Sequence, residues 1–167
     1  SIVLPNMMTS CVRSDPNNVI TLLANHSELG NGAYTVMSMM LAEELDVDYR
    51  IIALEAAPTS PEYYSPLFRE YLTAGSVTTG STFMPMRTAG AKARAMLLKA
   101  ASRDWQVPAA ELTTESGKVT HALSGRSSTY GELLEAIHRL DIQPPETVAL
   151  KDPSEFKILG KPARRYE

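Results

Sequence analysis

The amino-acid sequence predicts an α+β fold, a two-layer domain in which a mixed sheet packs against helices. Three stretches support this prediction: a strand, a helix and a second strand over residues 19–54, a long helix over residues 85–105, and a hairpin followed by a helix over residues 111–140. A chain of 167 residues has the size of one domain with its own core. We therefore expect one folded unit.

The first unit contains two apolar runs of strand length, residues 19–24 and 49–54. Between them, apolar residues recur at spacings of three and four, which predicts a helix with an apolar stripe that ends near Asp46. The stripe consists of Val36, Met37, Met40, Leu41 and Leu45. If the two strands are parallel neighbours, their connection is expected to be a right-handed crossover.

The long helix over residues 85–105 carries small residues along one face. At a spacing of four, one row contains Ala89, Ala93, Leu97, Ala101 and Trp105. Such a row would let another backbone or a flat ligand come close. Tight packing against another helix explains the alanines about as well, so both interpretations stay open.

The C-terminal third is expected to form a smaller unit. Residues 111–115 and 118–123 form two strands joined by the turn residues Ser116 and Gly117. Thr129 and Glu132 have the spacing of a capping box at the start of a third helix. Turn-forming residues are frequent afterwards, so we assign residues 1–147 to the folded module and residues 148–167 to a linker or tail toward a following domain.

Charge and composition argue against several function classes. The formal net charge is −3 and the basic residues are scattered, so the chain offers no basic field for nucleic acid. No apolar run approaches the roughly 20 residues that a membrane span requires. Cys11 is the only cysteine, so a cysteine-based metal site cannot form within this chain. We predict no protein-ligated metal site.

Two glycine-bearing segments are the candidates for ligand binding. Gly30-Asn31-Gly32 comes before the first helix, and Thr79-Gly80-Ser81-Thr82 comes before the long one. The free N–H groups and the positive dipole end of a helix start favour a phosphate or another anion, and glycine lets a ligand approach the backbone closely. Ordinary helix capping is the alternative, because neither segment completes a dinucleotide-binding or P-loop motif.

The other chemistry-bearing residues do not form a catalytic group. His26, His121 and His138 lack the short spacing that would suggest metal ligation, so we interpret them as structural or solvated. Glu43 and Glu44 are adjacent on a helix and cannot face each other as an acid/base pair. We expect both at a solvated edge of the first helix, and we assign no catalytic residue.

Several segments resemble, in the same order, the molybdopterin-binding large subunits of the xanthine dehydrogenase and aldehyde oxidase family. Residues 27–35 resemble the Glu-Met-Gly-Gln-Gly segment of that family. Residues 78–82 resemble the Thr-Gly-Gly-Ser-Thr segment of one branch, the β subunits of isoquinoline 1-oxidoreductase type. The match continues through residues 41–46, 87–97, 105–108, 130–133 and 150–153. The chain as a whole resembles the N-terminal module of such a large (β) subunit.

The resemblance implies a molybdenum-cofactor-binding-domain-like fold and contacts to the cofactor, which is molybdopterin alone or with a cytosine dinucleotide. The contacts are carried over to Gly30, Asn31, Gly32, Gly80, Ser81 and Thr82. Two positions depart from the family pattern. Asn31 stands where the family usually has glutamine, and Thr79 replaces a glycine.

The resemblance also implies a role in an oxidoreductase. The complete enzyme would oxidise an aldehyde or an N-heterocycle with oxygen from water and pass electrons to iron–sulfur clusters on a small partner subunit. This chain would contribute to the molybdopterin cradle, would not be active alone, and would have the remainder of the large subunit as its other partner. The alternative, which the departures at Asn31 and Thr79 favour, is a non-catalytic assembly module that binds no cofactor.

Two further expectations follow from the resemblance. Apolar faces, including the alanine-rich row, would be partly exposed when this chain is alone, because they would face the remainder of the large subunit. Members of the branch are often exported, so a periplasmic location is expected by resemblance, with a cytoplasmic one as the alternative.

Overall fold

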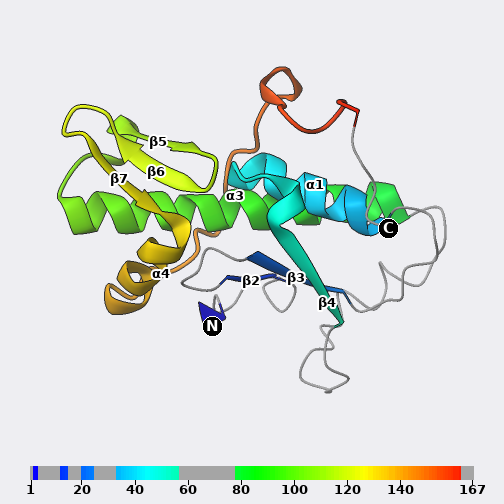
Figure 1. The fold of residues 1–167 in the computed structure, drawn as a ribbon, viewed down its shortest axis with the longest axis horizontal. Helices are drawn as coiled ribbons and strands as arrows, with labels where there is room; N and C mark the ends of the chain where they lie inside the picture. Colours follow the sequence, from blue (N-terminus) through cyan, green and yellow to red (C-terminus); the bar gives the residue numbers. More distant parts are fainter. Residues whose placement is uncertain (1, 4–11, 15–19, 25–32, 57–77, 163–167) are drawn as a thin grey trace.

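The computed structural model describes residues 2–3, 12–14, 20–24, 33–56 and 78–162, and these residues form the predicted mixture of helices and sheets (Figure 1). A mixed four-stranded sheet has the order β1-β2-β3-β4. Its strands are β1 (Ile2–Val3), β2 (Val12–Ser14), β3 (Ile20–Ala24) and β4 (Ile52–Ala56). The pairs β1/β2 and β2/β3 are antiparallel, whereas β3 and β4 are parallel neighbours, the case for which the sequence predicts a right-handed crossover.

The second sheet is antiparallel and consists of β5 (Leu112–Glu115), β6 (Lys118–His121) and β7 (Arg126–Thr129). Ser116 and Gly117 form the predicted two-residue turn between β5 and β6, and both have positive φ angles, of 49° and 75°. Positive φ at both positions is the geometry of the turn type that matches strand twist. The hairpin was thus predicted from the sequence, whereas β7 was not, and β6 ends at His121 rather than at residue 123.

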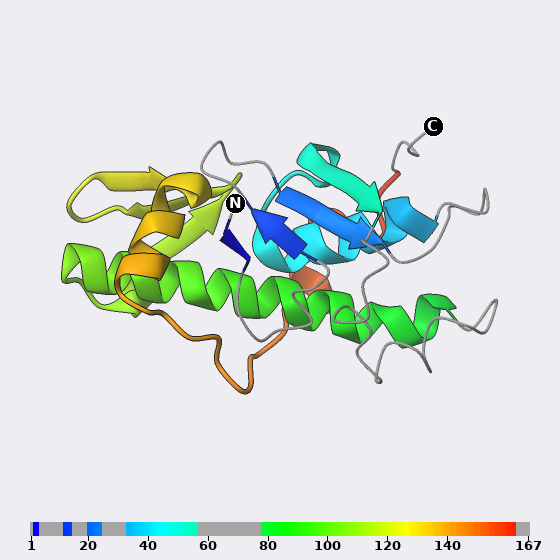
Figure 2. The same cartoon turned by 90° about the horizontal axis from the view of Figure 1, so that it is seen from below.

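Among the described residues, three α-helices connect and cover the two sheets. They are α1 (Ala33–Leu45), α3 (Thr78–Trp105) and α4 (Tyr130–Arg139), with single 3₁₀ turns η2 (Tyr49–Ile51), η4 (Ala109–Glu111) and η5 (Pro153–Glu155). The four-stranded sheet lies against one side of α1, while α3 runs along another side and continues under the second sheet and α4 (Figure 2). The predicted capping box at Thr129 and Glu132 is present at the start of α4.

Two predicted boundaries were wrong. The helix expected from about residue 85 begins at Thr78, so the segment around Gly80 is the first turn of α3 rather than a loop ahead of it. Ser, Thr and Gly are common both in loops and at helix starts, so their composition does not separate the two. The strand expected from Tyr49 begins only at Ile52, because the Asp48 side chain accepts the N–H of Arg50 and forms the turn η2.

Helix α1 is the centre of the fold. Every residue from Ser38 to Leu45 is buried, so the helix has no solvated face over this stretch. The expectation that Glu43 and Glu44 lie at a solvated edge is therefore wrong, because both are buried with 2% and 1% exposure. The predicted apolar stripe is present, but polar and charged residues on the other faces of the helix are buried as well.

Helices α1 and α3 approach each other closely at Gly90. A Cβ atom at this position would lie 2.6 Å from the Leu41 carbonyl oxygen and 3.1 Å from the Glu44 Cβ. The alanine-rich row of α3 is also inside the fold, since Ala89, Ala93 and Ala101 are buried. Tight packing thus explains the row, and the expectation that it is exposed in the isolated chain is wrong.

The segment after α4 has little regular structure but is anchored to α1. Residues 150–159 cross the helix pair, and Lys151 and the backbone of residues 157–159 bind the carboxylates of α1. Residues 163–167 lie outside the described part of the chain. The division into a module of residues 1–147 and a linker of residues 148–167 stays a prediction.

Candidate functional site

Helix α1, which follows the first glycine-bearing segment, and helix α3, which begins with the second, run parallel to each other (Figure 1). Three contacts define their alignment: Glu44 binds Arg87, Asp46 binds Arg94, and Leu41 meets Gly90. The partners differ by 43 to 49 positions in the sequence. Both helices advance by about 1.5 Å per residue, so the same offset in sequence holds back to their N-terminal ends. Ala33, at the start of α1, therefore lies about level with the first turn of α3.

The alignment gives the two predicted segments a common location. Gly30, Asn31 and Gly32 lie outside the described residues, but they immediately precede Ala33 in the chain. Gly80, Ser81 and Thr82 lie in the first turns of α3, and the first N–H groups of this helix have no partner within it. The structure therefore brings the start of α1 and the second segment to the same end of one helix pair.

The electrostatics of this end suit an anion. Each helix contributes a positive partial charge of roughly half an elementary charge at its N-terminus, and two parallel helices place both on one side. Neither helix has an acidic residue in its first turn whose negative charge would neutralise this positive potential. A cofactor that carries phosphate fits this arrangement because the phosphate can accept backbone N–H groups while it meets a favourable dipole field.

The C-terminal end of α1 and the part of α3 that faces it hold a buried network of charges that sequence reasoning missed. Glu44 accepts the Arg87 Nε and Nη2 groups at 2.9 and 2.7 Å, and it also accepts the backbone N–H of Lys151 at 3.1 Å. The Arg87 Nη2 group donates in addition to the Lys151 carbonyl oxygen at 2.6 Å. These three residues join α1, α3 and the C-terminal segment.

Glu43 holds the C-terminal segment separately. Its two carboxylate oxygens accept the backbone N–H groups of Lys157, Ile158 and Leu159 at 2.7, 2.7 and 2.8 Å. Three amide donors on one carboxylate satisfy a buried charge without a basic side chain. Glu43 is therefore a structural residue.

Asp46, the residue after α1, connects four elements. Its carboxylate binds the Lys151 ammonium group, the Arg94 Nε at 3.3 Å and the Thr114 hydroxyl at 2.5 Å. Its carbonyl oxygen accepts the N–H of Gly117 at 3.0 Å. Asp46 adopts a φ of 56°, a left-handed conformation that aspartate tolerates better than most residues. The requirement for this conformation is one reason for an aspartate at the end of α1.

Tyr130 closes the same region from α4. It is 1% exposed, and its hydroxyl donates to the Leu45 carbonyl oxygen at 2.6 Å. Burial raises the pKa of Tyr130 well above its ordinary value of 10.0, and the negative charge of Asp46 raises it further. The folded protein consequently binds the phenolic proton more tightly than the unfolded chain does.

This difference predicts a component of alkaline denaturation. The contribution of Tyr130 is complete below pH 10.0, the pKa of an unperturbed tyrosine, and is lost progressively as the pH rises above it. Above that pH, the wild type should lose up to about 1.4 kcal/mol per pH unit more than Tyr130→Phe. Denaturant unfolding of both proteins across this range measures the difference. Parallel curves would show that this phenol does not cause the loss.

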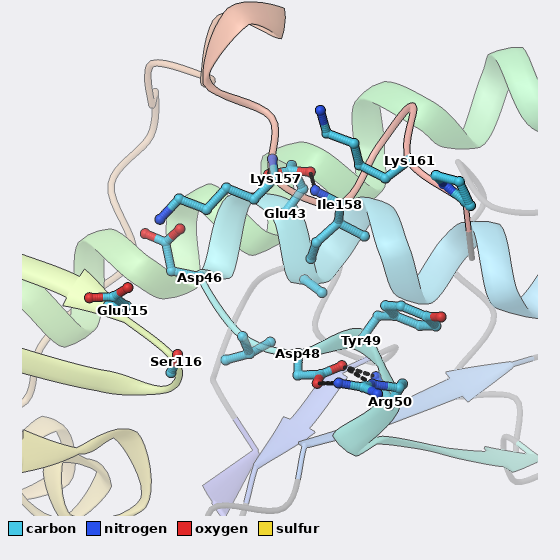
Figure 3. A pocket seen from close by; sticks show the side chains of 13 residues that line it. Glu43, Asp46, Asp48, Tyr49, Arg50, Glu115, Ser116, Lys157, Ile158 and Lys161 are labelled. Atoms are coloured by element: carbon cyan, nitrogen blue, oxygen red, sulfur yellow. Dashed lines mark hydrogen bonds and ion pairs between the residues drawn. The ribbon is translucent and has the colours of Figure 1, made fainter. Parts of the chain in front are cut away.

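A hollow of about 460 Å³ lies near the C-terminal end of α1 (Figure 3). Its lining comes from α1, η2, the β5–β6 turn and the C-terminal segment, and includes Tyr49, Ser116 and Ile158. Asp48 and Arg50 at its rim bind each other, and the Arg50 hydrogen bond lowers the pKa of Asp48. The hollow thus lies at the opposite end of α1 from the two predicted segments.

Two of the three histidines lie in the described part of the chain. His121 is buried, with Nε2 at 2.7 Å from Glu111 Oε2 and Nδ1 at 2.6 Å from Ser124 Oγ, whereas His138 is exposed on α4. His26 and Cys11 lie outside the described residues. Within residues 33–56 and 78–162 and the described strands, no three His, Cys, Asp or Glu side chains gather as metal ligands. Among the same residues, no helix combines the length and apolar character needed to cross a membrane.

Comparison with known proteins bears on these observations. A family model for the molybdopterin cofactor-binding domain matches residues 3–165. The β subunit of isoquinoline 1-oxidoreductase from Brevundimonas diminuta is 39% identical over 137 residues, which cover 81% of this chain and 17% of that protein. A subunit of nicotinate dehydrogenase from Pseudomonas putida is 29% identical over 145 residues, 85% of this chain and 11% of that protein.

A solved structure shows a similar fold. Quinoline 2-oxidoreductase from Pseudomonas putida 86 has a TM-score of 0.58 at 18% identity, over 83% of this chain and 17% of that chain. The present chain spans less than a fifth of the length of each of these proteins. The family match over residues 3–165, together with the 39% identity to one relative, shows that the chain belongs to the molybdopterin cofactor-binding domain family.

Proposed function

We propose that this chain forms part of the molybdenum-cofactor cradle in the large subunit of a molybdenum hydroxylase. The observation that carries the proposal is the parallel alignment of α1 and α3, which places the start of α1 level with Gly80, Ser81 and Thr82. In the cradle, Gly30, Asn31 and Gly32 would hold the cofactor from one side and the start of α3 from the other. Family membership supports this assignment.

In this proposal, the cofactor and the other parts of the enzyme provide the redox chemistry, the substrate site and the electron acceptor. When bound, the molybdenum cofactor supplies the redox centre for hydroxylation with oxygen from water. The substrate is an aldehyde or an N-heterocycle, and isoquinoline, nicotinate and quinoline in the names of the related proteins support the second class. Iron–sulfur clusters on a small partner subunit accept the electrons, and the remainder of the large subunit completes the cradle.

This chain's own contribution is electrostatic and geometric. The two helix starts orient N–H donors toward the phosphate of the cofactor and keep that field in a fixed direction. A cytosine dinucleotide would add a second phosphate for the same donors. No proton transfer is assigned to a residue of this chain.

A negative charge at the start of α3 tests the proposal. Ser81→Asp should leave the fold intact or stabilise it by about 0.3–1 kcal/mol, because an acidic residue in a first turn interacts favourably with the helix dipole. The same charge should repel the phosphate of the cofactor and lower cofactor occupancy by roughly tenfold or more. Thermal unfolding and molybdenum content of the assembled enzyme measure the two effects.

Ala122→Asp is the matched control, because it adds the same charge at an exposed position of the hairpin after β6. It should change neither the stability nor the molybdenum content. Full molybdenum content in Ser81→Asp would place the cofactor elsewhere. Absence of molybdenum from an assembled wild-type enzyme would instead favour an assembly module that binds no cofactor.

A further inference from the structure

Three sequence segments outside the two cofactor-binding candidates converge in the fold. Glu44 comes from α1, Arg87 from α3, and Lys151 and Phe156 from the C-terminal segment. Glu44 and Lys151 are 107 positions apart in the sequence. We call Glu44, Arg87 and Lys151 the register cluster.

Arg87 has the geometry of a fixed connector rather than of a surface ion pair. Its side chain is 8% exposed and that of Glu44 is 1% exposed. Its guanidinium donates to both Glu44 and the Lys151 carbonyl oxygen, and it lies 4.8 Å from the centre of the Phe156 ring. A planar guanidinium held by two acceptors and an aromatic ring permits little displacement along the helix.

The register cluster fixes how far α3 lies along α1. A shift of one helical turn is about 5.4 Å, which would separate Arg87 from Glu44 and bring the side chains beside Gly90 against the Leu41 carbonyl. Gly90 already leaves no room for a Cβ there. The axial position of α3 is thus set by the register cluster and the close approach at Gly90 together.

The same axial position determines how the two helix starts meet. Arg87 is nine residues after Thr78, so it lies about 13 Å along α3 from the first turn of that helix. A rigid helix carries any displacement at Arg87 to its start. The contact that sets the register is therefore remote from the cofactor. It nevertheless determines how the N–H donors at the start of α1 are placed relative to those at the start of α3.

We propose that Glu44, Arg87 and Lys151 are positioning residues for the molybdenum cofactor. This inference rests on the proposed function. The register cluster holds α1 and α3 in the one alignment in which both helix starts contact the same cofactor. The C-terminal segment takes part because Lys151 binds both Glu44 and Arg87.

The test uses one single variant and one double variant of the chain, co-expressed with the remainder of its large subunit. Arg87→Met leaves the Glu44 carboxylate buried without its guanidinium partner, so both stability and molybdenum content should fall. Glu44→Gln with Arg87→Met removes both charges, and replacement of a whole buried ion pair is often neutral for stability. The melting temperature should then recover, while molybdenum and pterin per assembled protein should remain lower by roughly tenfold, as for loss of outer contacts at other metal sites.

Two further variants complete the design. Arg87→Lys keeps the charge, but a compact ammonium group cannot reproduce the guanidinium contacts to Glu44, Lys151 and Phe156, so it should fold and still lose cofactor. Arg139→Ala removes an exposed ion pair with Asp104 at the far end of α3 and should retain cofactor. If the double variant does not fold, the cofactor content of Arg87→Lys can still be compared with that of the wild type.

The outcomes separate the two proposals. Full molybdenum content in the double variant or in Arg87→Lys would show that the register cluster is merely structural. Low content with a recovered melting temperature supports the positioning role. An assembled wild-type enzyme without molybdenum would refute the proposed function and, with it, the positioning role.

Discussion

Asp46→Ala should lower the free energy of unfolding by about 3–5 kcal/mol, the range expected when one partner of a buried ion pair is removed. The Lys151 ammonium group would lose its charged acceptor and keep the Glu43 carbonyl oxygen. The Thr114 hydroxyl would lose its acceptor, and Arg94 would lose its ion pair. Alanine would also have to adopt the φ of 56° that Asp46 has, at a cost of about 1–2 kcal/mol. Denaturant unfolding monitored by circular dichroism measures the total.

Asp46→Asn separates the two causes of this loss. Asparagine tolerates the left-handed conformation and keeps one acceptor oxygen, but it removes the charge that Lys151 and Arg94 bind. Its loss should be roughly half of that in Asp46→Ala. Equal losses in the two variants would show that the charge accounts for the effect and that the backbone conformation adds nothing.

Glu43→Ala should lower the free energy of unfolding by about 3–4 kcal/mol, because it leaves the N–H groups of Lys157, Ile158 and Leu159 without their charged acceptor. The C-terminal segment should detach before the remainder of the domain unfolds, since these bonds join it to α1. Limited trypsin digestion should therefore cut after Lys157 in the variant at a concentration that leaves the wild type intact.

Glu135→Ala is the control for Glu43→Ala, because Glu135 has a side chain that is 81% exposed on α4. It should change stability by no more than about 0.5 kcal/mol. If Glu43→Ala unfolds in the same way as this control, and trypsin does not cut faster after Lys157, the three amide contacts do not anchor the segment.

Local features were predicted well because neighbours in the sequence determine them. The turn at Ser116 and Gly117 and the capping box at Thr129 each depend on residues within three positions of one another. The helix before Asp46 followed from a repeat of apolar residues, and the order of β3, α1 and β4 followed from the apolar runs on either side of that helix. These predictions needed no knowledge of tertiary contacts.

The buried charges could not be predicted in the same way. The partners of Glu43 and Glu44 lie 43 to 116 positions away, and adjacent glutamates on a helix most often face water. The one signal was indirect, since Glu43, Glu44, Arg87 and Lys151 all belong to the segments that carry the family resemblance. The start of α3 was misplaced for a different reason, because threonine, glycine and serine suit a loop and a helix start alike.

The sequence predicted the residues of the candidate site but not their arrangement in space. The two glycine-bearing segments were identified by their residues, but only the structure shows that α1 and α3 run parallel with their starts level. That alignment is the central element of the account, and Gly30, Asn31 and Gly32 remain predicted contacts outside the described residues.

The most direct measurement is molybdenum by elemental analysis, with fluorescence of the oxidised pterin, on this chain alone and after co-expression with the remainder of its large subunit. A cradle shared between the two parts predicts about one molybdenum and one pterin per assembled complex, and far less on the isolated chain. An assembled, folded complex without either would contradict the account and leave this chain as an assembly module.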